Sequence, residues 1–112
     1  VGFRETEFYD QVCYLCQQAV EKYIKAVIVA FKGEITKNEK IHNLNILAEL
    51  GKTLVDLNQF NQELRILTAA YIPTRYPDES HLKAFSKQEA KQSLEIAEKI
   101  INYIQKKLQD AL

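Results

Sequence analysis

The chain has 112 residues, the length of a single domain, so we expect one domain over residues 1–112. Hydrophobic residues make up 46% of it and charged residues 27%, a balance typical of a folded globular domain. Fifteen basic residues offset fifteen acidic ones, which excludes a protein that binds nucleic acid through its overall charge. Only three glycines and two prolines are present, too few for the many turns of a β-barrel or β-sandwich.

The sequence shows no feature of a membrane or secreted protein. No apolar run approaches the roughly 18–20 residues of a transmembrane helix, and no signal peptide opens the chain. Two cysteines are too few for a disulfide framework. We therefore predict a cytoplasmic protein without a membrane partner. Because the chain starts at Val1 and contains no methionine, we also expect that an N-terminal element is missing from it.

Residues 4–32 contain no proline or glycine and are predicted to form one long helix, ended by Gly33. Apolar residues recur on it in two adjacent stripes, which make an apolar face wider than one neighbouring helix can cover. This helix is therefore expected to be central, in contact with two neighbours or with a second subunit. The first stripe consists of Phe8, Val12, Leu15, Ala19, Tyr23, Ala26 and Ala30, and the second of Cys16, Val20, Ile24, Val27 and Phe31.

Three further helices are predicted downstream. The second follows His42 and carries leucines as far as Leu54, and the third spans about residues 60–71. Two prolines make about residues 72–85 a long irregular connection, which we expect to be ordered. The last helix runs to about residue 110, begins with a capping box of Ser86 and Glu89, and has a seam of Ala90, Leu94, Ala97, Ile101, Ile104 and Leu108. The chain is thus predicted to be all-α, an up-and-down antiparallel bundle of four main helices.

Cys13 and Cys16 have the spacing of a metal-binding or redox pair, but the chain lacks matching partners. Tetrahedral zinc needs four ligands, no second cysteine pair exists, and His42 and His81 are distant in the sequence. A reactive dithiol needs a helix N-terminus, whereas both cysteines are predicted to lie well inside a helix among apolar residues. We therefore interpret them as two small buried hydrophobic residues and predict no metal and no cofactor.

The segment Tyr71-Ile-Pro-Thr-Arg-Tyr-Pro-Asp-Glu-Ser-His81 holds the residues best suited to chemistry. Its Arg75 offers a planar fork for a phosphate, and His81 is the side chain that titrates near neutral pH. Together they could hold a phosphodiester and abstract a 2′-hydroxyl proton, which is the chemistry of metal-free RNA cleavage. The alternative is structural: Arg75 pairs with Asp78 or Glu21 to fix the loop, and His81 is an ordinary surface residue.

A second polar group lies on the first helix. Gln18, Lys22 and Lys25 fall within two turns on nearly one side, and Glu21 is the i,i+4 partner of Lys25. If the proline-containing connection packs there, both lysines and Arg75 form a cationic patch in spite of the zero net charge. Such a patch would suit a nucleotide phosphate or an acidic partner. The alternative is that both lysines extend over a solvent-facing surface.

Strings of residues spread over nearly the whole chain resemble the HEPN domain, named for "higher eukaryotes and prokaryotes nucleotide-binding". They are Gln17-Gln18-Ala19-Val20-Glu21-Lys22-Tyr23-Ile24-Lys25-Ala26, His42-Asn43-Leu44, and Thr74-Arg75-Tyr76-Pro77-Asp78, followed by the alanine and isoleucine seam of the last helix. The resemblance implies an up-and-down helical bundle that is often a homodimer. It also implies a further short N-terminal helix in many members, which this chain would lack. Structural roles are expected for Gln18, Glu21, His42 and Pro77.

The resemblance implies two functional branches. In one, a small HEPN protein binds a minimal nucleotidyltransferase as a toxin–antitoxin-like pair. In the other, HEPN proteins are metal-independent ribonucleases that bring an arginine and a histidine together across a dimer, usually from a helix, which Pro77 forbids here. Our main prediction is the non-catalytic binding module, in which the nucleotide or partner contacts come from Lys22, Lys25, Arg75, Tyr76 and Asp78. The alternatives are a ribonuclease that uses Arg75 and His81, and a purely structural dimerisation domain.

Overall fold

The computed structural model describes residues 5–32, 43–70 and 85–111, and these ranges contain helices and turns but no strand. In chain order the elements are α1 (Glu5–Lys32), α2 (Leu44–Leu50), the short 3₁₀ helix η1 (Asn58–Phe60), α3 (Asn61–Thr68) and α5 (Lys87–Ala111). The predicted all-α bundle is therefore confirmed. Within the same ranges, no helix combines the length and the apolar character that a membrane crossing requires.

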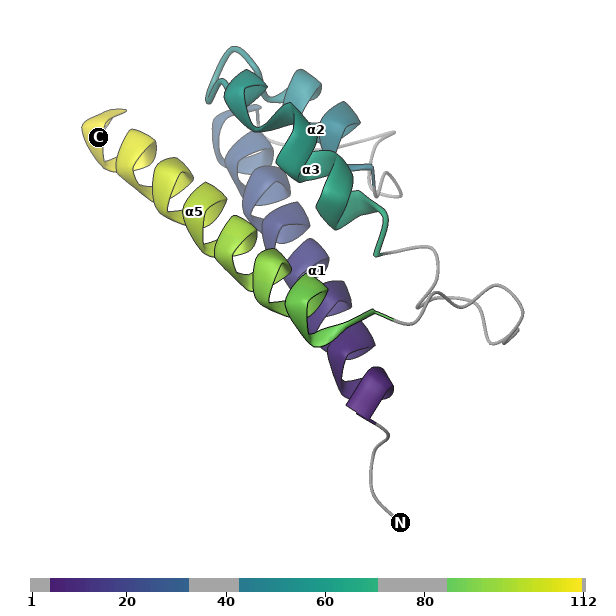
Figure 1. Cartoon of the computed structure of the whole chain (residues 1–112). Helices are drawn as coiled ribbons and strands as arrows, with labels where there is room; N and C mark the ends of the chain where they lie inside the picture. The colour runs from purple at the N-terminus through teal and green to yellow at the C-terminus, as the bar shows by residue number, and fades with distance from the viewer. Residues whose placement is uncertain (1–4, 33–42, 71–84, 112) are drawn as a thin grey trace.

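The helices form two layers (Figure 1). The long helices α1 and α5 lie side by side, and the α2–α3 hairpin covers one face of this pair. α1 and α5 run in the same direction, as two hydrogen bonds between them show. Phe85 N–H donates to Asp10 Oδ1 at 2.7 Å near the start of both helices. Farther along both helices, Gln105 Nε2 donates to Tyr23 Oη at 3.0 Å. The antiparallel arrangement expected from the sequence thus describes α2 with α3 and α3 with α5, whereas the two long helices are parallel.

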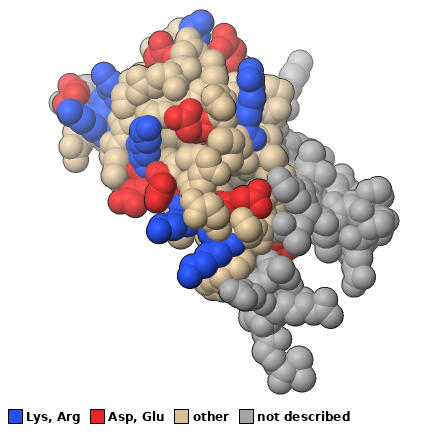
Figure 2. Space-filling view, viewed as in Figure 1, with Lys and Arg blue, Asp and Glu red and all other residues tan. Residues whose placement is uncertain are grey.

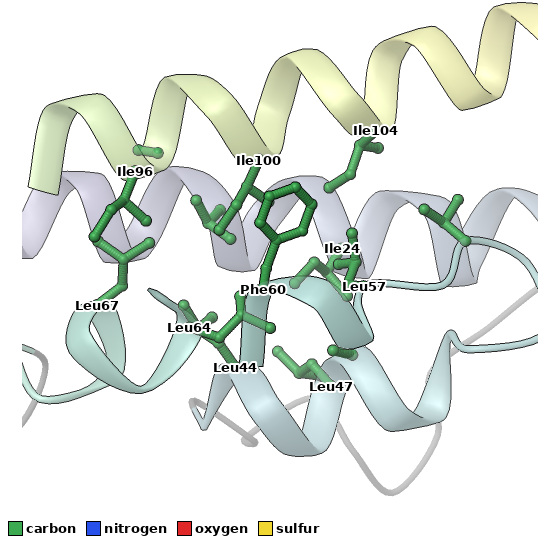
Figure 3. Close-up of a cluster of buried hydrophobic side chains, with 14 of the residues drawn as sticks. Ile24, Leu44, Leu47, Leu57, Phe60, Leu64, Leu67, Ile96, Ile100 and Ile104 are labelled. Atoms are coloured by element: carbon green, nitrogen blue, oxygen red, sulfur yellow. The ribbon is translucent and has the colours of Figure 1, made fainter. Parts of the chain in front are cut away.

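An apolar core fills the space between the two layers (Figure 3). The isoleucines of α5 point toward the leucines of α2 and α3, and the ring of Phe60 lies between them. That ring also meets the ring of Tyr103 edge-on, with 5.2 Å between the centroids. The fully buried side chains of this core include Leu44, Leu47, Leu64, Leu67, Ile100, Ile104 and Val20.

The helix ends follow local sequence signals. Asn43 caps α2, since its side chain accepts hydrogen bonds from the backbone N–H groups of residues 45 and 46. α2 then ends at Leu50, before Gly51, so the predicted extension to Leu54 is wrong; residues 51–54 form turns instead. At the start of α5, Ser86 Oγ accepts from Glu89 N–H and Ser86 N–H donates to Glu89 Oε1, which confirms the capping box.

The second of the two apolar stripes predicted on α1 faces the core, and the first does so only in part, through Val12 and Tyr23. Most of the second stripe is buried, together with Cys13 and Ile28, but its last member, Phe31, is 49% exposed. Phe8 and Leu15, from the first stripe, are 56% and 60% exposed. The seam predicted on α5 is mostly confirmed: Ala90, Ala97 and Ile104 are buried, and Ile101 and Leu108 pack against the core. Its exception is Leu94, which is 54% exposed, whereas the neighbouring Ser93 is buried. The molecule therefore carries apolar side chains on the outer face of both long helices.

Candidate functional site

Three polar residues of α1, one helical turn apart, form a cluster that we call the α1 polar cluster: Gln17, Glu21 and Lys25. Gln17 Nε2 donates to Glu21 Oε1 at 2.9 Å, and Lys25 Nζ donates to Glu21 Oε2 at 3.0 Å. Gln17 is fully buried and Glu21 is 6% exposed. Because a buried carboxylate is costly without donors and a countercharge, the two neighbours make its burial tolerable.

The i,i+4 pairing of Glu21 with Lys25 was predicted correctly, but the burial of Glu21 and the part played by Gln17 were missed. A residue that is charged in the sequence is expected to face solvent, since buried charges are rare. The signal that could have identified the cluster is its spacing, because residues 17, 21 and 25 lie at i, i+4 and i+8 on one helix face.

The predicted cationic patch is smaller than expected in the part of the chain that the structure describes. The side chain of Lys25 is 19% exposed, and its ammonium forms an ion pair with the buried Glu21 carboxylate. Its charge is therefore largely compensated before any ligand arrives. Lys22 is exposed and Gln18 is half-buried. Lys22 is thus the lysine of this pair that presents its side chain to solvent.

The connection over residues 71–84 leaves and rejoins the bundle at one place on α1. Ala70, which precedes it, and Phe85, which follows it, both pack with Cys13 and Ala90 in a small buried cluster. The backbone N–H of Phe85 is also held by the carboxylate of Asp10, at 2.7 Å. Cys13 lies one helical turn before Gln17, so both ends of the connection are fixed beside the α1 polar cluster.

A family model described as "HEPN domain" matches residues 3–108. The chain belongs to the HEPN domain family. The resemblance predicted from its residue strings is confirmed. The search of curated proteins and the search of solved structures each returned no match.

The sequence strings of this HEPN domain fall on different parts of the structure. The first string lies on α1 and contains the whole α1 polar cluster. Asn43 and Leu44 of the second string form the start of α2, where Asn43 is the cap. The other predicted site residues lie outside the described residues, and their roles stay predictions: His42, Arg75, Tyr76, Pro77, Asp78 and His81.

The two cysteines of the HEPN domain are free and buried, as predicted. Ser93 Oγ donates to Cys13 Sγ at 3.5 Å. Burial, and secondarily the neighbouring Cys13, raises the pKa of Cys16 from 9.0 to about 11, so this thiol stays protonated and unreactive at neutral pH. Within the described ranges, no group of three or more His, Cys, Asp and Glu side chains is placed to hold a metal ion. The interpretation of both cysteines as core residues is therefore supported.

Proposed function

We propose that this HEPN domain is a cytoplasmic, non-catalytic binding module. It forms a homodimer, pairs with a minimal nucleotidyltransferase in a toxin–antitoxin-like system, and contacts a nucleotide phosphate through Arg75. The observation that carries this proposal is the anchoring of both ends of the 71–84 connection beside the α1 polar cluster. That anchoring limits how far Arg75 can lie from the first helix.

Chain lengths set this limit. Arg75 follows Ala70 by five residues, which span at most about 17 Å when fully extended. Glu21 lies eight residues beyond Cys13 on α1, a rise of about 12 Å. The exposed Lys22 is one residue farther. Arg75 can therefore lie level with Lys22 along the axis of α1, although Lys22 is nine residues, and so about half a turn around the helix, from Cys13. An arginine and a lysine that approach the same ligand suit a phosphate group.

Each side chain then has a defined part. Arg75 provides a bidentate fork for the phosphate, and Lys22 adds a second positive charge. Glu21 fixes Lys25 through their ion pair and keeps its ammonium beside the site. The Glu21 carboxylate offsets most of the positive charge of that ammonium. Tyr76 stacks on the base or packs beneath the loop, and Asp78 orients the partner's donors.

Calorimetric titration with ATP tests nucleotide binding directly. We expect Arg75→Gln to weaken binding about 10- to 100-fold, the equivalent of one lost charge-assisted hydrogen bond, and Lys22→Gln to weaken it less. The matched control is Lys52→Gln, which removes the same charge from an exposed lysine paired with Glu49 beyond the end of α2. Co-purification with the product of the neighbouring gene, which we expect to be a nucleotidyltransferase, tests the pairing.

The rival functions make different predictions. If neither ATP nor the nucleotidyltransferase binds, the proposal is wrong. Cleavage of RNA by the purified protein, abolished by His81→Ala, would instead identify the ribonuclease. An Arg75→Ala variant with a lower melting temperature and unchanged binding would show that Arg75 only fixes the connection, as in the structural alternative.

A further inference from the structure

A groove lies between α3 and α5, and we call it the α3–α5 groove. Its main cavity has a volume of about 430 Å³ and opens to solvent. The two helices contribute nearly equally to its walls. It is lined by Gln62, Glu63, Ile66, Gln92, Glu95, Ile96 and Lys99.

The groove continues toward the start of α5. A second cavity, of about 230 Å³, shares Ile66 and Gln92 with the first and extends to Phe85. On α5 the lining residues run from Glu89 to Lys99, a rise of about 15 Å. This length matches two to three turns of a helix laid between α3 and α5.

The sequence explains why this groove stays open. α3 has eight residues against the 25 of α5, and side chains of Gln and Glu stand where apolar residues would close the contact. Ile66 remains half-buried on the floor, next to the buried Ile96. An apolar floor between polar walls is the surface on which an amphipathic helix docks.

Charge favours one kind of occupant. Glu63 and Glu95 line the main cavity against the single amine of Lys99. Lys99 stands at one end, 4.0 Å from Glu63 and 6.0 Å from the centroid of the Phe60 ring. Figure 2 shows this side of the molecule with acidic and basic side chains interspersed, so the acidic bias is local to the groove.

We propose that the α3–α5 groove binds a basic amphipathic helix of a partner protein. The apolar stripe of that helix covers Ile66 and Ile96, and its lysines or arginines meet Glu63 and Glu95. Such a helix would pack against α3 and α5 at the usual helix–helix separation of about 8–10 Å. None of the residues that line the groove is among those proposed to contact the nucleotide, so the test below needs no ATP.

The probe for this test is a synthetic 14-residue helical peptide with a leucine stripe flanked by lysines four residues apart. Its partner peptide has glutamate in place of every lysine. NMR of ¹³C-labelled isoleucine methyl groups reports the contact: Ile66 and Ile96 should shift and saturate, whereas Ile46, exposed on α2, should not. The glutamate peptide should cause no saturable shift.

Variants test the charge argument. We expect Glu63→Gln combined with Glu95→Gln to weaken binding of the lysine peptide about 5-fold, as two exposed ion pairs of about 0.5 kcal/mol each predict. Glu98→Gln removes the same charge from an exposed α5 residue outside the groove and should leave the affinity unchanged. The proposal is overturned if the lysine peptide causes no shift, if Ile46 shifts equally, if the glutamate peptide binds as well, or if the double variant binds like the original protein.

Discussion

At the scale of single residues, the least expected feature is a carboxylate inside the bundle. Glu21 is nearly as buried as its apolar neighbours on α1, yet both of its oxygens accept hydrogen bonds, from Gln17 and Lys25. All three side chains lie on one helix. Their hydrogen bonds to one another can therefore form together with α1, and the rest of the bundle excludes water from them.

Glu21→Gln should destabilise the protein by about 1–3 kcal/mol, because it replaces the buried carboxylate that pairs with the ammonium of Lys25 by a neutral amide. Urea unfolding of the variant measures the effect. Adding Lys25→Met should recover part of the loss, since it removes the unmatched charge. Glu98→Gln, on the exposed side of α5, is the control and should change stability by less than about 0.5 kcal/mol. Equal stability of the two single variants would contradict the account.

Cys16 predicts how stability depends on alkaline pH. Its pKa is raised to about 11 in the folded protein, from 9.0, by burial and then by Cys13. The unfolded thiol loses its proton first, so the contribution of Cys16 is complete below about pH 9 and is lost as the pH rises toward 11. Urea unfolding at several pH values should show a steeper alkaline decline than in Cys16→Ala, which lacks this thiol. Parallel pH profiles would show that Cys16 does not contribute.

At the scale of elements, the positions of the long helices along the chain could be predicted, but the face that each helix buries could be predicted only in part. Periodicity and the capping box placed α1 and α5 correctly because these signals are local. The two apolar stripes of α1 are chemically alike, so the sequence alone could not choose the one that faces α5 and the α2–α3 hairpin. Ser93 is buried against Cys13 in place of Leu94, a choice made by close helix packing rather than by hydrophobicity. In the candidate site, the pairing of Glu21 with Lys25 could be predicted because it depends on spacing along one helix. The burial of Glu21 was missed because it depends on how the helices pack.

The capping box at the start of α5 should contribute measurably to stability. Ser86→Ala removes the acceptor for the Glu89 N–H and should cost about 1 kcal/mol. Ser86→Asp keeps an acceptor at the cap and should stay within a few tenths of a kcal/mol of the original protein. Thermal or urea unfolding of the two variants separates the lost hydrogen bond from any effect of the altered side-chain volume. If both variants lose equal stability, the cap bond is not the cause.

At the scale of the whole molecule, large apolar side chains remain exposed on both long helices. Leu15 and Leu94 lie at about the same level along the two helix axes, because Cys13 and Ser93, close to them in sequence, contact each other. They are 60% and 54% exposed, and Phe8, farther down α1, is 56% exposed. Several large exposed apolar residues on one face are typical of an interaction surface. The expectation that α1 is central is confirmed within the chain, because α1 contacts α2, α3 and α5. Its exposed apolar residues are those that a second subunit could cover.

The homodimer proposed for this HEPN domain can be tested on that face. We expect Leu15→Lys combined with Leu94→Lys to convert a dimer to a monomer in sedimentation equilibrium at about 10 µM protein, because two charges in each copy would be buried without partners. Within each copy both side chains face outward, so stability of the monomeric fold should change by less than about 0.5 kcal/mol per site. Ile46→Lys is the matched control, since Ile46 is 49% exposed on the opposite layer and should leave the dimer intact. A dimer that survives the double substitution would exclude this face as the interface, and a monomeric original protein would remove the homodimer from the proposed function.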